Sequence, residues 1–139
     1  MPKGMERFGK VTYTSEAKVS DFVKYLEEGK VMATRCKKCG RLYFPPRADC
    51  PECFSEEYEW VPLSGKCKLI TYTVAHFAPT GFESDVPYVL AVAECEEGVK
   101  VFTRVSKDIS VDELKPGMEL KLAPIKVNED KYSFELQKP

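Results

Sequence analysis

The first recognisable pattern in the chain is that of an amphipathic helix. Four apolar residues have the i, i+3, i+4, i+7 spacing of one helical face: Val19, Phe22, Val23 and Leu26. The opposite face is charged: Lys18, Asp21, Lys24 and Glu28. Ser15 or Ser20 suits the N-cap, and Gly29 suits the position just past the C-terminal end. Because one short helix cannot bury its apolar stripe alone, we expect it to dock on the rest of the chain or on a partner.

From residue 66 the pattern changes to that of β-strands. Five segments are predicted strands: 66–77, 88–95, 99–105, 118–127 and 131–137. In the last of them Tyr132, Phe134 and Leu136 should point inward, and a slip in the apolar phase predicts a bulge or bend at Pro124. Ser110 and Glu113 have capping-box spacing between the third and fourth strands. A mainly β chain with this order predicts a five-stranded OB-fold barrel, with a plain sandwich as the alternative.

Four cysteines lie between these two regions, in two Cys-x-x-Cys clips separated by ten residues. They are Cys36, Cys39, Cys50 and Cys53. Such clips offer four thiolates to one tetrahedral ion, which indicates zinc, although iron is compatible with the same ligands. A site filled by four sulfur atoms has no position for a reactive water, so its role would be structural. The alternative is four free thiols in a loop with few apolar residues to order it. We therefore expect the metal to act as the core of this segment.

Six basic residues and no acidic one occur between positions 30 and 47. They are Lys30, Arg35, Lys37, Lys38, Arg41 and Arg47. Zinc bound to four thiolates carries a formal charge of about −2, which nearby cations stabilise.

Overall charge argues against a nucleic-acid partner. The 139 residues carry a net charge of −1, and positions 66–139 hold ten basic and twelve acidic residues. A zinc-ribbon and OB-fold module that binds nucleic acid is for this reason only the alternative function. No apolar run suits a membrane span, and the N-terminus does not resemble a signal peptide. We expect a cytoplasmic protein, in which paired cysteines bind metal more often than they form disulfides.

Residue types suited to catalysis are sparse. His76 is the only histidine, and Cys67 and Cys95 fall in strand segments, where small buried hydrophobic roles are expected. There is no Ser-His-Asp set, phosphate loop or dinucleotide motif. The sequence thus favours a protein that is not an enzyme. The loop 78–87 contains or adjoins three aromatic residues, Phe77, Phe82 and Tyr88. These residues either present a binding surface or close the end of the barrel.

A linked set of motifs from about residue 15 to residue 139 resembles the DUF35 family. The motifs are Phe22-Val23-Lys24-Tyr25-Leu26-Glu27-Glu28-Gly29-Lys30, Arg35-Cys36-x-x-Cys39-Gly40, Phe44-Pro45-Pro46-Arg47, Cys50-Pro51-x-Cys53, Trp60, Ser64-Gly65, Tyr72-Thr73-Val74-x-His76 and Pro87-Tyr88-Val89. The resemblance implies a helical lead-in over 1–34, a rubredoxin-like zinc ribbon over 35–60 and an OB-fold over 61–139. It also implies that the four clip cysteines bind the metal.

The same resemblance implies a role in acyl-CoA metabolism. Archaeal-type members of the family are non-catalytic bridges between acetoacetyl-CoA thiolase and HMG-CoA synthase in the mevalonate pathway. Other members accompany other thiolase-fold enzymes, so the partner of this chain is either that pair or another enzyme of the same fold. The resemblance also implies the phosphates of CoA as a contact for the basic residues of positions 30–47, as the alternative to charge compensation of the metal site. It carries over no catalytic residue.

Overall fold

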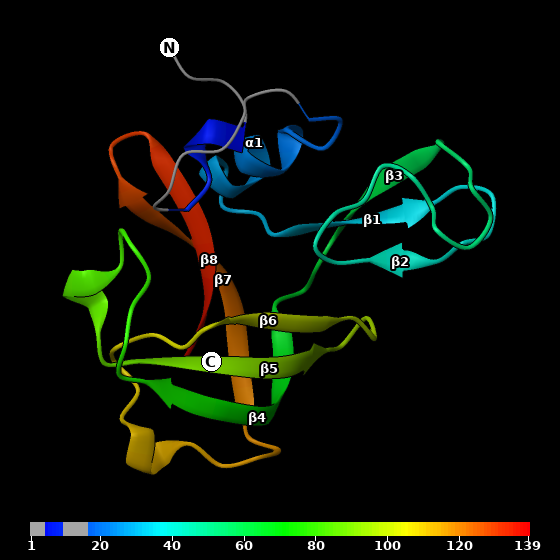
Figure 1. Ribbon diagram of the computed structural model, residues 1–139. Helices are drawn as coiled ribbons and strands as arrows, with labels where there is room; N and C mark the ends of the chain where they lie inside the picture. Colours follow the sequence, from blue (N-terminus) through cyan, green and yellow to red (C-terminus); the bar gives the residue numbers. More distant parts are fainter. Residues whose placement is uncertain (1–4, 10–16) are drawn as a thin grey trace.

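The computed structural model describes residues 5–9 and 17–139, which form a ribbon module and a barrel with one helix beside them (Figure 1). A short 3-10 helix, η1 (Met5–Arg7), precedes helix α1 (Asp21–Glu27). Ser15, one of the two predicted caps, lies outside the described residues. Ser20 occupies the N-cap, but its hydroxyl donates to the carbonyl of Ala17 and makes no cap hydrogen bond. Gly29 follows the helix with a φ of +86°, as its predicted role requires.

The ribbon module is a three-stranded antiparallel sheet in the order β2-β1-β3. Its strands are β1 (Met32–Cys36), β2 (Leu42–Tyr43) and β3 (Tyr58–Pro62). Strand β1 pairs with β3 along its whole length, and its last residue, Cys36, is the first clip cysteine. The ribbon sheet therefore runs from residue 32 to residue 62 and extends beyond both ends of the zinc ribbon expected over 35–60.

The second module is a five-stranded sheet in the order β6-β5-β4-β7-β8. Its strands are β4 (Lys66–Ala75), β5 (Tyr88–Cys95), β6 (Lys100–Arg104), β7 (Glu119–Asn128) and β8 (Lys131–Gln137). The two edge strands also meet. A parallel bridge joins Val105 to Leu136, and the Thr103 hydroxyl donates to the carbonyl of Phe134 at 3.0 Å. The sheet thus closes on itself, and the prediction of an OB-fold barrel is confirmed.

The short connections of the barrel follow the sequence pattern in part. Helix η2 (Glu83–Asp85) lies in the β4–β5 loop and helix η3 (Val111–Glu113) in the β6–β7 loop. The predicted capping box at η3 is present. The Ser110 N–H donates to the carboxylate of Glu113 at 3.0 Å, and the hydroxyl of Ser110 accepts from the N–H of Asp112 at 3.3 Å. Of the bulge or bend predicted at Pro124, the bulge is wrong, because the β7–β8 ladder runs through Pro124↔Phe134 and shifts register only between Lys126 and Asn128. No contact of the structure tests the bend.

Pro124 fits the continuous ladder because β7 has parted from β4 at this point. The pairing of the two strands ends at Lys66↔Lys121, and the Leu122 N–H donates to the carbonyl of Gly65, the residue before β4. Strand β7 also contacts helix α1. A proline lacks an N–H group, and because the pairing with β4 ends before Pro124, no hydrogen bond of that ladder is lost.

One hydrophobic core joins helix, ribbon and barrel. Phe22 of α1 is 2% exposed and lies against three other rings, with centroid distances of 5.8–6.0 Å: Phe8, Phe44 and Phe134. Phe44 follows the ribbon strand β2, and Phe134 belongs to the barrel strand β8, with 5.2 Å between their centroids. The predicted docking of the helix stripe is therefore confirmed, and the helix fixes the ribbon against the barrel. Among the described residues, no helix is long and apolar enough to cross a bilayer.

Candidate metal centre

The two cysteine clips form matching turns at one end of the ribbon. In the first, the Gly40 N–H donates to the carbonyl of Cys36 at 2.9 Å, and Gly40 has a φ of +80°. In the second, the Phe54 N–H donates to the carbonyl of Cys50 at 2.9 Å, and Phe54 has a φ of +62°. A left-handed residue is thus needed after each clip. Glycine supplies it without strain in the first turn, whereas phenylalanine adopts it at a cost of about 1–2 kcal/mol in the second.

These turns bring the four predicted ligand residues together. Their sulfur atoms all lie within 4.8 Å of one another. Cys36 and Cys53 are 3.5 Å apart, as are Cys39 and Cys50, so none forms a disulfide. Zinc–sulfur bonds of about 2.3 Å in a tetrahedron place the sulfur atoms about 3.8 Å apart. The donor set and its spacing therefore fit one tetrahedral thiolate-bound ion.

Hydrogen bonds favour the thiolate form that a metal needs at two of the four cysteines, Cys36 and Cys50. The pKa of Cys39 is raised, and that of Cys53 is raised to about 11. The Tyr43 hydroxyl lies 3.3 Å from the sulfur of Cys50, and its hydrogen bond lowers the pKa of Cys50 to about 6. The same hydrogen bond raises the pKa of Tyr43 to about 12. The backbone N–H of Cys39 lowers the pKa of Cys36. Such donors compensate part of the negative charge of a four-thiolate site.

Protein contacts also hold the ribbon, so the metal is not its whole core. Thr34 is fully buried, and its hydroxyl both accepts from the N–H of Arg47 at 2.8 Å and donates to the carbonyl of Arg47 at 2.9 Å. This pair of bonds fixes the chain before the second clip onto β1. Three ribbon residues pack against the main core: Leu42, Phe44 and Trp60. Sequence patterns gave no sign of the Thr34 contact, because a lone threonine in a strand has no distinguishing neighbour.

The basic residues of positions 30–47 are all solvent-exposed. Arg35 lies 4.0 Å from a carboxylate oxygen of Glu59, and the Arg47 guanidinium lies 5.9 Å from the ring centroid of Tyr43. Arg47 thus stacks near the ring that donates to Cys50. Lys18, which precedes α1, contacts Asp49 at 3.2 Å and so ties the helix to the loop before the second clip.

The other candidate residues do not form a catalytic group. His76 is exposed just beyond one end of β4, whereas Cys67 and Cys95 are buried at the other end of β4 and β5. The burial predicted for both cysteines is confirmed.

The aromatic residues near the loop 78–87 differ in their exposure. Phe77 is 90% exposed, while Phe82 and Tyr88 lie beneath the guanidinium of Arg104 at 5.8 and 4.8 Å.

Comparisons with known proteins match both modules. Residues 24–59 match the family model "ChsH2, rubredoxin-like zinc ribbon domain", and residues 60–123 match "ChsH2, C-terminal OB-fold domain". The solved structure "Ltp2-ChsH2(DUF35) aldolase" superposes with a TM-score of 0.77 at 24% identity, over 91% of this chain and 98% of that one. This likeness supports the fold described above.

Two curated relatives are similar over most of the chain. A "DUF35 domain-containing scaffold protein" of Methanocaldococcus jannaschii is 40% identical over 72% of this chain and 71% of its own length. The "Benzoylsuccinyl-CoA thiolase subunit BbsA" of Geobacter metallireducens is 34% identical over 69% of this chain and 64% of its own length. With its zinc-ribbon and OB-fold modules and these relatives, the chain belongs to the DUF35 family.

Proposed function

We propose that this chain is a non-catalytic scaffold that bridges acetoacetyl-CoA thiolase and HMG-CoA synthase. The observation that carries the proposal is its 40% identity with a protein named as a DUF35 scaffold. A second relative is named as a subunit of a CoA thiolase, which supports an enzyme of the thiolase class as one partner. The scaffold name that the first relative shares with those of Pyrococcus furiosus and Methanothermobacter thermautotrophicus supports a non-catalytic role.

The metal proposed for the ribbon is a structural zinc ion held by Cys36, Cys39, Cys50 and Cys53. Bound there, zinc would supply four bonds that link the two clips and no open position for chemistry. Iron would satisfy the same ligands, and it would give the purified protein a red colour that is lost on reduction. Elemental analysis separates the two metals.

A bridge needs two surfaces on one rigid body, and the two modules offer one each. Phe54 at the tip of the ribbon is 85% exposed, and Phe77 at the end of barrel strand β4 is 90% exposed. Exposed aromatic side chains of this kind are frequent anchors of protein interfaces. The modules share the core around Phe22, which supports a fixed geometry for partners bound to both.

Such a geometry has a chemical use. The condensation of two acetyl-CoA molecules by a thiolase is thermodynamically uphill, so its product accumulates only to a low level. A synthase held beside the thiolase would consume acetoacetyl-CoA as it leaves. The scaffold would contribute proximity, and it would need no reactive group of its own.

The test is reconstitution with acetoacetyl-CoA thiolase and HMG-CoA synthase of the same organism. Size-exclusion chromatography should show the zinc-loaded chain eluting with both enzymes. Phe54→Ala and Phe77→Ala should each weaken the binding of a different enzyme by about 2 kcal/mol, roughly 30-fold. Glu52→Ala, at an exposed position two residues before Phe54, is the matched control and should leave both affinities unchanged.

Elution of the chain apart from both enzymes would reject the proposed bridging. A single-stranded oligonucleotide should show no binding that weakens steeply with salt. Such binding would instead favour the nucleic-acid-binding alternative.

A further inference from the structure

Two cysteines outside the metal centre face each other across neighbouring strands of the barrel. Cys67 of β4 is the direct register partner of Cys95 of β5. At the adjacent position, the Glu96 N–H donates to the carbonyl of Lys66 at 2.9 Å. Hydrogen-bonded and non-hydrogen-bonded pairs alternate along an antiparallel ladder, so the cysteines occupy a non-hydrogen-bonded position.

This position suits a covalent bond between the two sulfur atoms. Non-hydrogen-bonded partners have Cα atoms about 4.5 Å apart and their side chains on the same face of the sheet. A disulfide requires a Cα separation of roughly 4.4–6.8 Å. The bond could therefore form without a change in strand pairing.

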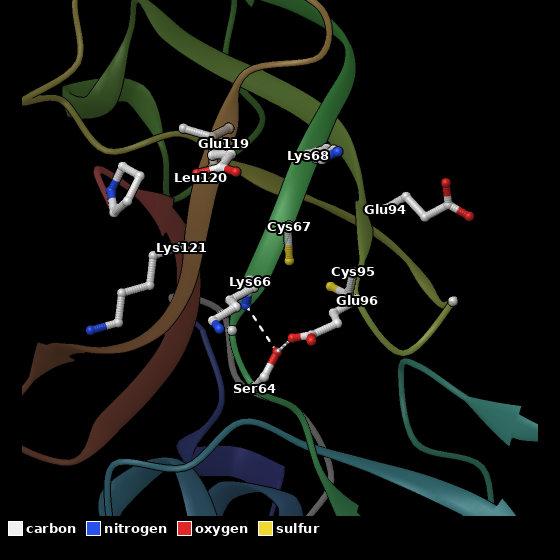
Figure 2. A pocket seen from close by; sticks show the side chains of 13 residues that line it. Ser64, Lys66, Cys67, Lys68, Glu94, Cys95, Glu96, Glu119, Leu120 and Lys121 are labelled. Carbon is white, nitrogen blue, oxygen red and sulfur yellow. Dashed lines mark hydrogen bonds between the residues drawn. The ribbon is translucent and has the colours of Figure 1, made fainter.

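Both cysteine residues border an open pocket of the barrel. Each cysteine is only 3% exposed, yet both line a pocket of about 860 Å³ where β4, β5 and β7 lie together. Figure 2 shows the two side chains on adjacent strands, with Lys66 and Lys68 on β4 beside them. This pocket is the side from which a small thiol or disulfide would approach the pair.

We propose that Cys67 and Cys95 are a reversible dithiol–disulfide couple that cross-links β4 to β5, with a low-molecular-weight disulfide as the oxidant. The thiolate of Cys67 attacks one sulfur of the oxidant, which forms a mixed disulfide and releases one thiolate. The thiolate of Cys95 then attacks the sulfur of Cys67, which forms the protein disulfide and releases the second thiolate. The two protons of the cysteines pass to the released thiolates, and the oxidant is reduced to two thiols.

The environment of the pair favours this order of attack. The hydrogen bond from the Cys95 thiol lowers the pKa of Cys67, and the same interaction raises the pKa of Cys95. Cys67 is therefore the more readily ionised of the two, and the thiolate is the attacking species in disulfide exchange.

The experiment treats the folded, metal-loaded full chain with oxidised glutathione, followed by alkylation, trypsin digestion and mass spectrometry without reduction. Trypsin cleaves after Lys66, Lys68 and Lys100, so a Cys67–Cys95 bond would keep residues 67–68 attached to residues 69–100. We expect this linked peptide, its disappearance after dithiothreitol, and a higher melting temperature for the cross-linked protein, since the bond closes the loop between the two strands. The Cys95→Ala variant should stop at a glutathione adduct on Cys67.

Recovery of residues 67–68 and 69–100 as separate alkylated peptides from the folded protein would overturn the proposal. A stable glutathione adduct on Cys67 of the unmodified chain would also overturn it, because Cys95 would then have failed to complete the exchange. Peptides from the metal clips are distinct from these, so oxidation of the clips cannot be mistaken for the proposed bond. If Cys95→Ala does not fold, the peptide map of the unmodified chain decides alone.

Discussion

Replacing Phe22 by alanine removes the ring through which the helix contacts both modules. The ring is 2% exposed and lies within 6.0 Å, centroid to centroid, of Phe8, Phe44 and Phe134. Of these, Phe44 belongs to the ribbon side and Phe134 to the barrel. The substitution therefore tests whether the modules share a core or only touch.

The expected loss of stability is large because the site is enclosed by three rings. Burial of a phenylalanine and the cavity left by its removal together amount to about 3–5 kcal/mol. Loss of the edge-to-face contacts is contained in that range. For a chain of this length about 4 °C accompanies each kcal/mol, so the melting temperature should fall by about 12–20 °C.

Thermal unfolding of the metal-loaded protein, followed by circular dichroism, measures this change. Phe22→Leu should cost less than about 1.5 kcal/mol, because it retains most of the apolar volume. Phe77→Ala, at a ring that is 90% exposed, should change stability by less than about 0.5 kcal/mol. If Phe22→Ala were no more destabilising than Phe77→Ala, the shared core could not be what holds the ribbon to the barrel.

Three further substitutions and their controls test local features by the same unfolding measurement. Gly65→Ala should destabilise more than Gly117→Ala, because both have a φ near +90° but only at Gly65 would a Cβ meet a backbone oxygen, at 3.0 Å; equal losses would contradict the close contact. Thr34→Val should cost about 2–4 kcal/mol, because it leaves the N–H and carbonyl of Arg47 without their buried partner, whereas Thr34→Ser should cost about 1 kcal/mol; similar costs would refute a role for the hydroxyl. Phe54→Gly should stabilise the chain by up to about 1 kcal/mol, because glycine adopts a positive φ without strain; a clear loss of stability would mean that the ring contributes to the fold.

Local periodicity was sufficient to predict the main elements. The stripe of Phe22, Val23 and Leu26 is buried as its spacing required, and the strands at 88–95 and 131–137 have the predicted bounds. The clip spacing likewise predicted which residues would meet, and all four sulfur atoms lie together. The helix and strands were predictable because each depends on residues close together in sequence. The two clips, although Cys36 and Cys53 are 17 residues apart, were predictable because one tetrahedral ion requires four ligands.

Features that depend on residues in other segments of the chain were not predicted from the sequence. The register shift of β7 lies between Lys126 and Asn128 and not at Pro124. The positions of apolar residues in β7 depend on its packing against β4, β8 and helix α1 as well as on the geometry of the strand itself. The Thr34–Arg47 contact and the four-ring cluster each join segments that no local pattern connects. The facing of Cys67 and Cys95 depends on the register of β4 with β5, and a shift of one residue would have separated them.

Native mass spectrometry of the affinity-isolated chain, expressed at its natural level, tests the central claim most directly. One spectrum reports both the metal content of the chain and the masses of its partners. The account predicts one zinc ion per chain in an assembly that also contains a thiolase and HMG-CoA synthase. A metal-free chain that carries neither enzyme would contradict it.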